Sequence, residues 1–332
     1  MELKNKRVLL FVPGGCGIYG TEIKKSIECF GASVHVYNER PSSSTAGKIF
    51  TRLTKKISDI PFNAYIESVV RERIGMDYDY VLIIRAEAFK VSSIKILRCA
   101  FPRAKMILYL WDSLANTDVR DIVDSFDVAY SYDPMDVSVH KGLKYCPTFY
   151  LDQYRAVSGL DIIPYIDLFF AGTVHSDRYE VIDRVRKKLD LIGRKLIAYY
   201  YFPSRLLYIK KYIEQPLIRS EDYKKILFKM IGVTEMARFV SRSSVVLDIQ
   251  HPMQTGLTLR PIEVLGSRRK LITTNTNIAS YDFYDENNIM IVDRVLPKIH
   301  PEFFESPYRD VEKKVYERYS MKSWVSRIFS LS

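Results

Sequence analysis

Short apolar runs alternate with longer amphipathic segments along the whole chain. Near the start, Arg7–Val12 and Ser33–Tyr37 read as buried strands, and the segment from about Thr21 to Phe30 between them has helical periodicity. Gly31 stands where a helix commonly ends. A strand, a helix and a second strand in this order predict parallel strands joined by a right-handed crossover.

The same alternation continues in two successive series. The further predicted strands are Tyr80–Ile84, Lys105–Leu110, Val128–Tyr132 and Tyr145–Tyr150, then Asp167–Phe170, Lys195–Tyr201, Ser244–Ile249, Lys270–Thr274 and Ile289–Val292. The further predicted helices are Ala46–Ile74 with an interruption near Pro61, Lys90–Cys99, Ser176–Leu191, Thr234–Ser241, Thr258–Gly266 and a basic helix over Tyr308–Phe329. Ser176 is a candidate N-cap.

Two β/α series of similar size predict an α/β protein with two Rossmann-like domains that face a cleft. We expect an N-terminal domain over residues 1–155, a C-terminal domain over 156–307, and a helix in 308–332 that packs back toward the first domain. Open parallel sheets bind ligands beyond the carboxyl ends of their strands, so we expect the site in the cleft.

Composition is that of an ordinary globular protein: 332 residues, 47% hydrophobic and 27% charged. No apolar run approaches the about 18 residues that a membrane-spanning helix needs. The apolar stretch Val8–Val12 is too short for a secretory signal. The four cysteines have no C-x-x-C spacing, so we expect reduced thiols and a cytoplasmic location.

The net charge of +11 favours an anionic partner, such as nucleic acid, an anionic membrane surface or a phosphorylated substrate. The alternative is that the charge serves solubility alone. The abundant tyrosines and phenylalanines are spread along the chain and form no nucleic-acid-binding pattern, so we expect no nucleic-acid partner.

A glycine-rich turn, with Gly14, Gly15 and Gly17, follows the first strand. Glycines let a backbone approach a ligand, and the following helix N-terminus favours negative charge. With Gly20 the turn also fits G-x-G-x-x-G, with Glu39 as the ribose-binding acid of an NAD site. Three interpretations stay open: a loop that contacts substrate or acceptor, a dinucleotide site, and a tight turn without a ligand.

Two acidic motifs are candidates for catalysis. Asp77 and Asp79 have the D-x-D spacing of a metal site, but they precede a strand, at the end of the sheet away from ligands. Asp112 follows a strand and is a candidate general base, or else an N-cap. Asp133 and Asp136, after the next strand, compete for that role.

The densest polar stretch follows the strand Ser244–Ile249. The hydroxyls of Thr255 and Thr258, Gly256 and a helix N-terminus would form a cradle for an anion. Arg260 can contact a phosphate in a bidentate way, and Glu263 can accept hydrogen bonds from a ribose diol. The alternative is a capped helix in which Glu263 pairs with Arg260.

These features resemble a known family. Two β/α halves, a glycine turn after the first strand and a turn–helix–Glu element in the second half resemble GT-B glycosyltransferases. The stretches DLFFAGTVHSDRYEVI and QTGLTLRPIEVLGSRRKLITTN look like those of bacterial capsule and lipopolysaccharide transferases, including CgeB-like ones.

The resemblance implies that the second half binds a nucleotide-sugar and the first half the acceptor, with no cofactor and no metal. The donor-binding residues are then Gly172, Thr173, Arg178, Thr255, Gly256, Leu257, Thr258, Arg260 and Glu263. Gly14, Gly15 and Gly17 contact the acceptor, and Asp112 is the catalytic base if the enzyme inverts. Thr255 stands where many retaining members carry the first acid of a Glu-x7-Glu motif, so the stereochemical outcome stays open.

The predicted function is therefore transfer of a sugar from a nucleotide-sugar to a hydroxyl of a surface glycan, free or lipid-linked, at the inner face of the cytoplasmic membrane. The alternatives are a nucleotide-sugar epimerase of the same fold, a non-catalytic scaffold that binds nucleotide-sugar, and an NAD oxidoreductase.

Overall fold

The computed structural model describes residues 2–14, 17–40, 59–173, 177–219, 221–252 and 254–331. The chain folds into two compact units. The first comprises Met1–Pro147 together with Met321–Ser332, and the second comprises Thr148–Ser320.

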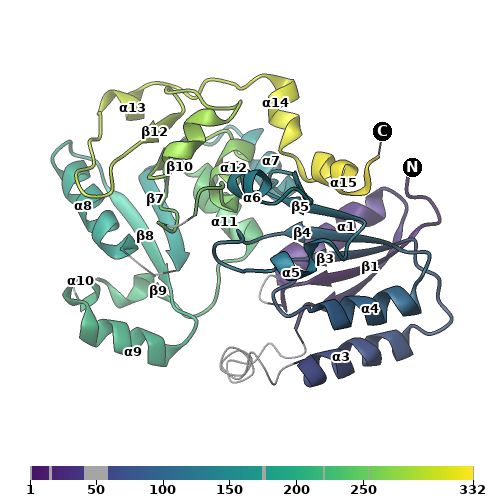
Figure 1. Ribbon diagram of the computed structural model, residues 1–332. Coiled ribbons are helices and arrows are strands. Elements are labelled where there is room, and N and C mark those ends of the chain that lie inside the picture. The colour runs from purple at the N-terminus through teal and green to yellow at the C-terminus, as the bar shows by residue number, and fades with distance from the viewer. Residues whose placement is uncertain are drawn as a thin grey trace. The chain divides into compact units, whose positions relative to one another are not determined.

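The first unit is built on a parallel sheet with the strand order β2-β1-β3-β4-β5-β6 (Figure 1). Its strands are β1 (Arg7–Val12), β2 (Ser33–Asn38), β3 (Tyr80–Ile84), β4 (Lys105–Leu110), β5 (Val128–Ser131) and β6 (Leu143–Tyr145). Its described helices are α1 (Gly17–Cys29), α3 (Asp59–Glu72), α4 (Val91–Ala100), α5 (Arg120–Val123), α6 (Pro134–Val139) and α15 (Met321–Phe329).

Helices cover both faces of this sheet, which explains why its strands are almost continuously apolar. On one face, Phe11 and Ile83 share a buried cluster with Ile66 of α3 and Leu97 of α4. The other face is covered by α1 and α15, which contact each other. The ring of Trp324 in α15 meets Tyr109 of β4 edge-on, with 5.1 Å between the ring centroids.

The second unit repeats the plan, with the parallel order β12-β11-β10-β7-β8-β9. Its strands are β7 (Ile166–Thr173), β8 (Leu196–Tyr201), β9 (Ile226–Leu227), β10 (Ser243–Asp248), β11 (Lys270–Thr273) and β12 (Ile289–Ile291). Its described helices, including the 3-10 turns η2 and η3, are α7 (Asp152–Ser158), α8 (Arg178–Asp190), α9 (Arg205–Glu214), α10 (Pro216–Arg219), η2 (Tyr223–Lys225), α11 (Val233–Ser241), α12 (Leu259–Gly266), η3 (Thr276–Ser280), α13 (Glu302–Glu305) and α14 (Lys313–Arg318).

Both faces of the second sheet are also buried. Leu168 and Phe170 of β7 pack with Val181 of α8, whereas Phe169 between them stacks on Phe239 of α11 with 5.2 Å between centroids. The alternation of neighbouring side chains between the two faces follows from the pleat of a strand. The predicted α/β class with two parallel sheets is thus confirmed.

Several local predictions differ from the structure. The first helix begins at Gly17 rather than Thr21, directly after the glycine turn. The predicted strand Tyr145–Tyr150 is wrong, since β6 ends at Tyr145 and Tyr150 makes only an isolated bridge to Ser320. Of the predicted helix Ala46–Ile74, residues 46–58 lie outside the described residues, as does Ser176.

The predicted terminal helix over Tyr308–Phe329 is wrong as a single helix. Between α14 and α15 the backbone pairs with Tyr150, whose N–H donates to the carbonyl of Tyr319 at 2.8 Å. This pairing interrupts the helical hydrogen bonds although the amphipathic pattern of the sequence continues. It also separates α14, in the second unit, from α15, in the first.

The domain boundary also differs from residue 155, because α7 contacts α11 and α12 and the second unit already begins at Thr148.

Among the described residues, no helix combines the length and hydropathy that crossing a bilayer requires.

One close contact in the second unit provides a test of the packing. A Cβ added to Gly266, the last residue of α12, would lie 2.5 Å from Cγ and 2.7 Å from Cβ of the fully buried Tyr150. We expect Gly266→Ala to lower the free energy of unfolding by about 1–3 kcal/mol, because the buried ring has to move. Denaturant or thermal unfolding measures this loss.

Gly159→Ala is the matched control. A Cβ at Gly159 meets nothing within 4 Å, and its φ of −89° suits alanine. Equal stability of the two variants would contradict the close packing of α12 on Tyr150.

Candidate active site

The strand order of each sheet reverses at one point, between β1 and β3 in the first unit and between β7 and β10 in the second. Connections leave such a point in opposite directions, which opens a crevice at the carboxyl ends of the two strands. The predicted residues gather at these ends: Gly14 follows β1, Gly172 and Thr173 end β7, and the turn with Thr255 follows β10.

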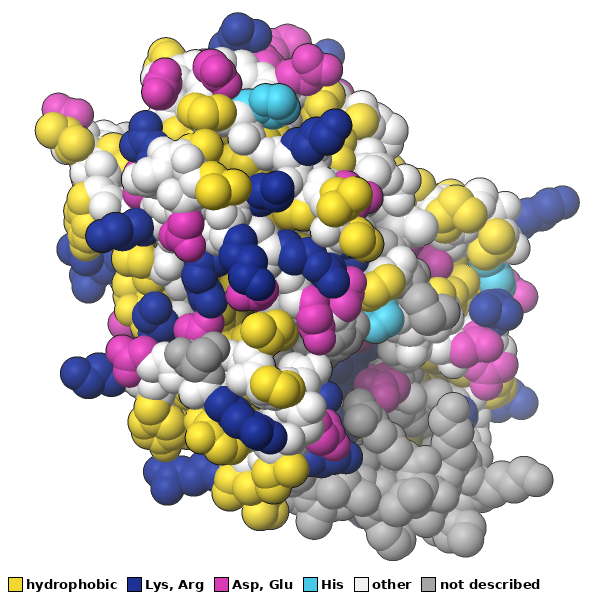
Figure 2. Space-filling view, turned by 90° about the vertical axis from the view of Figure 1, so that its left-hand side faces the viewer, with side chains coloured by type: hydrophobic (Ala, Val, Ile, Leu, Met, Phe, Trp, Pro, Cys, Tyr) yellow, Lys and Arg dark blue, Asp and Glu magenta, His cyan; other side chains and the backbone are white. Residues whose placement is uncertain are grey.

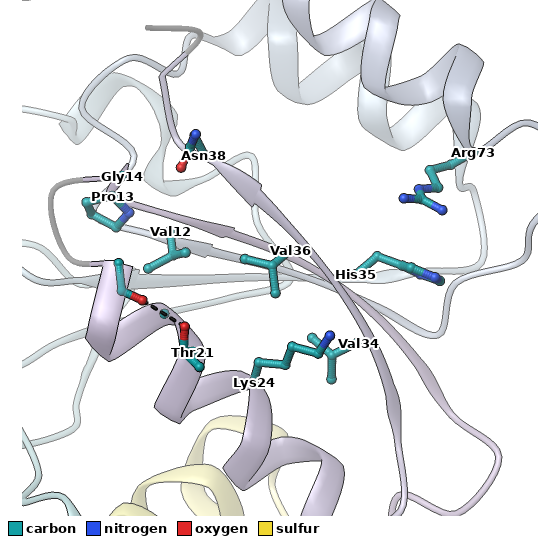
Figure 3. A pocket seen from close by; sticks show the side chains of 12 residues that line it. Val12, Pro13, Gly14, Thr21, Lys24, Val34, His35, Val36, Asn38 and Arg73 are labelled. Carbon is teal, nitrogen blue, oxygen red and sulfur yellow. Dashed lines mark hydrogen bonds between the residues drawn. The ribbon is translucent and has the colours of Figure 1, made fainter. Parts of the chain in front are cut away.

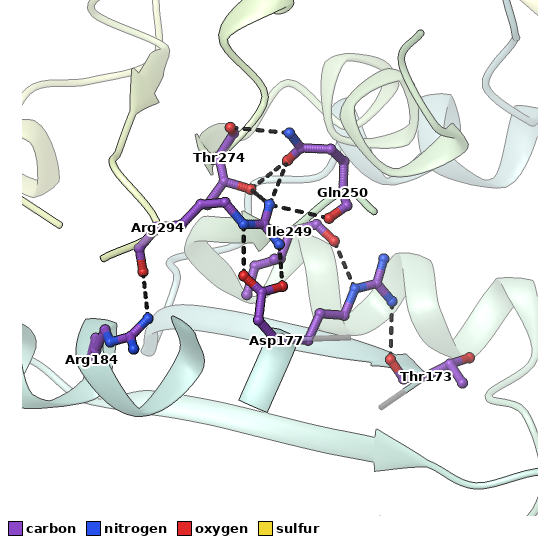
Figure 4. A network of polar contacts seen from close by, with 8 residues as sticks. Thr173, Asp177, Arg184, Ile249, Gln250, Thr274 and Arg294 are labelled. Carbon is purple, nitrogen blue, oxygen red and sulfur yellow. Dashed lines mark hydrogen bonds and ion pairs between the residues drawn. The ribbon is translucent and has the colours of Figure 1, made fainter. Parts of the chain in front are cut away.

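Arg178 connects the two strand ends of the second unit (Figure 4). Its Nε donates to the carbonyl of Ile249, after β10, at 2.7 Å, and its Nη1 donates to the carbonyl of Thr173 at 3.0 Å. Burial lowers the pKa of Arg178. Two backbone carbonyls thus hold the guanidinium of Arg178 at this edge, and its contact with donor phosphates stays a prediction.

Asp248, at the end of β10, is a buried carboxylate that sequence reasoning missed. Its Oδ2 accepts a hydrogen bond from the hydroxyl of Thr273 at 3.0 Å, and Thr258 also hydrogen-bonds to it. Burial raises the pKa of Asp248, whereas the charges of Arg178 and Arg260 oppose this rise. The sequence does carry a signal for Asp248, because it is the one acid in the apolar strand run SVVLDI and stands near the end of that run.

The turn before α12 contains the residues of the predicted anion cradle. Gly256 and Leu257 are buried in it, and the carbonyl of Thr255 accepts hydrogen bonds from the side-chain amides of Asn275 and Asn277 at 3.4 and 3.2 Å. Thr258 is the N-cap of α12, but its side chain makes no capping hydrogen bond. The N-terminal N–H groups of α12 therefore have no side-chain cap from this residue.

Arg260 and Glu263 form the ion pair that the sequence left open as the alternative. Arg260 Nη1 lies 3.0 Å from Oε2 of Glu263, and its Nη2 donates to the carbonyl of Ala171 in β7 at 3.4 Å. Only 3% of Glu263 is exposed, and the hydroxyl of Tyr154 in α7 hydrogen-bonds with both partners. The ribose contact of Glu263 stays a prediction.

A second polar network, also missed from the sequence, joins the other strand ends (Figure 4). Arg294, after β12, donates to both carboxylate oxygens of Asp177, from Nε at 2.9 Å and from Nη2 at 2.5 Å. Its Nη1 donates to the hydroxyl of Thr274 at 3.0 Å and to the carbonyl of Gln250 at 3.3 Å. One guanidinium thus connects the ends of β10, β11 and β12 to the start of α8.

In the first unit, Asp112 lies two residues beyond β4 and is half-buried. Burial raises the pKa of Asp112; the charges of Arg85 and Arg40 lower it, and that of Glu87 adds to the rise. A carboxyl group with a raised pKa is a better proton acceptor than an ordinary aspartate, provided that it is ionised at the working pH.

Arg85, beside this carboxylate, occupies a strained turn. Arg85 and Ala86 follow β3 with φ of 76° and 61°, a left-handed conformation that costs free energy in residues other than glycine. In this conformation Nε and Nη2 of Arg85 both donate to Oε2 of Glu39, at 2.9 and 2.6 Å. Glu39 is completely buried, and its contact with the ribose of NAD stays a prediction.

The predicted glycine turn borders a groove of about 550 Å³ in the first unit (Figure 3). Gly14 and Gly17 line it, and Gly15 lies outside the described residues. The lining is apolar in the middle and polar at both ends, with Lys24, His35 and Arg73 at one end: Val12, Pro13, Gly14, Gly17, Gly20, Thr21, Lys24, Val34, His35, Val36, Asn38 and Arg73.

The competing carboxylates make structural contacts. Asp133 caps α6 by accepting the N–H of Met135 at 3.0 Å. Asp136, which is 4% exposed, accepts the N–H of Leu114 at 3.1 Å and the hydroxyl of Ser131 at 2.6 Å.

The D-x-D pair lies before β3 and pairs with cations. Asp77 forms an ion pair with Arg103, and Asp79 accepts hydrogen bonds from Nζ of Lys6 at 2.8 Å and from the N–H of Arg7 at 2.9 Å.

Solved structures share this fold over 95% or more of their own length. A glycosyltransferase from Rickettsia africae ESF-5 aligns with 99% of this chain and 100% of its own, at 11% identity and a TM-score of 0.61. Sucrose-phosphate synthase from Thermosynechococcus elongatus aligns with 98% of this chain and 95% of its own, at 14% identity and a TM-score of 0.54. The UDP-GlcNAc 2-epimerase from Methanocaldococcus jannaschii aligns with 99% of this chain and 100% of its own, at 10% identity and a TM-score of 0.51.

No family model and no curated protein sequence matches the chain. At these identities the structural likeness defines the fold. The protein has the two-domain α/β fold of GT-B glycosyltransferases, a fold that sugar-nucleotide epimerases also use.

The pair of Asp177 and Arg294 predicts a pH dependence of stability. The hydrogen bonds from Arg294 hold the pKa of Asp177 below its ordinary value of 3.8. The pair therefore stabilises the folded state above about pH 3.8, and this contribution is lost as the pH falls through the lower folded pKa. We expect the difference in melting temperature between the wild type and Asp177→Asn to be largest near neutral pH and to shrink below pH 4.

Asp310→Asn is the control, since it removes an exposed ion pair with Arg268 in the same unit, and such pairs contribute little. A difference between wild type and Asp177→Asn that stays constant from neutral to acidic pH would show that the carboxylate charge has no such role.

Proposed function

We propose that this protein is a glycosyltransferase that moves a sugar from a nucleotide-sugar donor to a hydroxyl of a surface glycan. The observation that carries the proposal is the turn Thr255–Thr258, which leads into α12 beside the end of β7, with Arg260 and Glu263 on its first turns. This is the switch point of the second sheet, where such folds bind nucleotides.

The donor would lie with its diphosphate against the N-terminal N–H groups of α12 and the Thr255–Thr258 turn. Gly172 and Thr173 would face the phosphates from β7, and Arg178 and Arg260 would supply positive charge. Two solved neighbours contain such ligands: an α-glucosyltransferase holds UDP, and a protein from Anabaena holds UDP-glucose.

The ion pair between Arg260 and Glu263 suggests how the site responds to its ligand. A diphosphate is a stronger partner for a guanidinium than a single carboxylate is. In the proposal, the arriving diphosphate draws Arg260 away from Glu263, and the freed carboxylate accepts hydrogen bonds from the ribose hydroxyls. Binding of the phosphates and of the ribose is then coupled through one side-chain movement.

In the transfer step, the acceptor oxygen bonds to the anomeric carbon while the bond between that carbon and the diphosphate oxygen breaks. The N–H groups, the threonine hydroxyls and Arg260 stabilise the charge that develops on the leaving diphosphate, so we propose that the enzyme works without a metal. Asp112 takes the proton of the acceptor hydroxyl if the reaction inverts the anomeric centre.

The acceptor would bind to the first unit, at the groove beside Gly14 and Gly17. Lys24 and Arg73 at one end of this groove favour an acceptor with an anionic group, and the apolar middle favours a less polar body. A glycan linked to a lipid through phosphate has both properties. We therefore propose a cytoplasmic enzyme that works at the inner membrane face on a capsule or lipopolysaccharide precursor.

The epimerase function remains the second candidate, because solved neighbours include UDP-GlcNAc 2-epimerases from Listeria monocytogenes and Methanocaldococcus jannaschii. Release of nucleoside diphosphate only when both donor and acceptor are present supports the transferase. Interconversion of the donor without an acceptor supports the epimerase. Donor binding without any turnover supports a scaffold.

Glu263→Gln tests the donor site. Gln keeps the size of the side chain but removes the charge, and hydrogen bonds to a charged group are worth about 1.5–3 kcal/mol. We expect an affinity about tenfold lower for whichever of UDP, GDP, CDP and dTDP the wild type binds best, measured by titration calorimetry.

Asp310→Asn, which also neutralises an acid with an arginine partner in the second unit, should leave this affinity unchanged. Equal affinities of wild type and Glu263→Gln would reject the donor-site assignment.

Asp112→Asn tests the base. The amide cannot accept the proton, so we expect turnover to fall at least about a hundredfold while donor affinity stays the same. The assay measures nucleoside diphosphate release with and without EDTA, and we expect the wild type to be equally active in both.

Asp118→Asn is the control in the same unit, because Asp118 is exposed and pairs with its sequence neighbour Arg120 at the surface. Full activity of Asp112→Asn would end the role of this carboxylate, and loss of wild-type activity in EDTA would contradict the metal-free mechanism.

A further inference from the structure

The helix α9 exposes an apolar stripe to solvent. Leu206, Ile209 and Ile213 are 79%, 52% and 66% exposed. Ile209 and Ile213 follow Leu206 by three and seven residues, so all three side chains lie along one side of the helix. No residue of α9 is buried. An ordinary surface helix presents its polar side to water, and α9 presents an apolar one.

The helix is held in this orientation by contacts on its inner side. Tyr208 meets Phe202 edge-on with 5.2 Å between centroids, and its ring also contacts Tyr223 and Phe228. Arg219 donates to the carbonyls of Tyr212 and Ile213 at the end of α9, at 2.8 and 2.5 Å. The aromatic cluster and this cap fix which side of the helix faces outward.

The chain segment that contains the stripe is basic. Between Arg205 and Met230 the sequence has seven Lys and Arg against three Asp and Glu, so this short segment carries more than a third of the net charge of the chain. Tyr223 and Met230, in the same segment, are 58% and 57% exposed. Hydrophobic and basic side chains are mixed in the lower part of Figure 2, at the level of α9 in Figure 1.

These properties select one kind of partner. Single exposed apolar residues are common on soluble proteins, but a contiguous apolar patch marks an interaction surface. An outward apolar stripe bordered by lysines and arginines matches helices that lie in the interface of an anionic bilayer. There the apolar side chains enter the headgroup region and the cations contact lipid phosphates.

We propose that the outer face of α9, formed by Leu206, Ile209 and Ile213, binds the surface of an anionic lipid bilayer. Lys210 lies next to the stripe, and Lys224, Lys225 and Lys229 follow in the same basic segment. That this contact serves sugar transfer to a lipid-linked acceptor rests on the proposed function, whereas the binding itself does not.

The test is sedimentation of the full chain with vesicles of phosphatidylcholine alone and with vesicles that also contain phosphatidylglycerol. The wild type should bind only the anionic vesicles, and added salt should weaken the binding. The double variant Leu206→Ser, Ile213→Ser should bind about tenfold more weakly, because it removes two of the three inserted side chains. Ile163→Ser with Leu191→Ser is the matched control, since both residues are 78% exposed or more in the same unit, and should bind like the wild type.

Absence of wild-type binding to anionic vesicles, or equal binding of wild type and the α9 double variant, would overturn the proposal. A dimer in sedimentation velocity that the α9 variant abolishes would also overturn it, in favour of contact between two copies of the chain. Calorimetry with nucleoside diphosphates keeps the two proposals apart: vesicle binding without nucleotide binding rejects the proposed function and leaves the lipid-binding face standing.

Discussion

Parallel pairing of every strand in the two sheets is the constraint on which the candidate site depends. Because all strands of a sheet run the same way, residues far apart in the sequence meet at one edge. In the second unit this edge brings together Thr173, Asp248, Thr274 and Arg294. In the first it brings Glu39, Arg85 and Asp112 together. The helices between the strands supply the buried faces that make the arrangement stable.

Both edges hold a buried carboxylate against an arginine, Glu39 with Arg85 and Glu263 with Arg260. Removing a charged group from water is costly, and a buried pair offsets this cost only with good geometry, so losing one partner costs about 3–5 kcal/mol. Arg85 makes two hydrogen bonds to the fully buried Glu39, an arrangement that suits a structural pair. Arg260 contacts Glu263, Tyr154 and the carbonyl of Ala171, and Arg85 likewise lies 3.6 Å from Glu87 as well as on Glu39.

The sequence predicts the architecture well because buried parallel strands leave an unmistakable apolar signal. The runs RVLLFV, YVLII, KMILYL and SVVLDI are all central strands. The region from Phe202 to Gly232 carried no such signal, and α9 and α10 within it were missed, since the exposed apolar positions of α9 do not mark a core-facing stripe. The pair of Arg260 and Glu263, three residues apart, could be weighed from the sequence, but ion pairs between distant residues could not be predicted. Nothing local in the sequence indicates that Arg294 reaches Asp177, because 117 residues separate them.

The first unit is discontinuous in the chain, since Trp324 of α15 fills its core against Tyr109. During synthesis, the second unit is complete before the last helix of the first has left the ribosome. Domains generally fold as they emerge, N-terminal parts first. Here one face of the sheet in the earlier-made unit stays partly uncovered until Met321–Ser332 has been synthesised. The order of synthesis and the order of completion are thus reversed, and a truncation that removes α15 acts on the half of the protein that was made first.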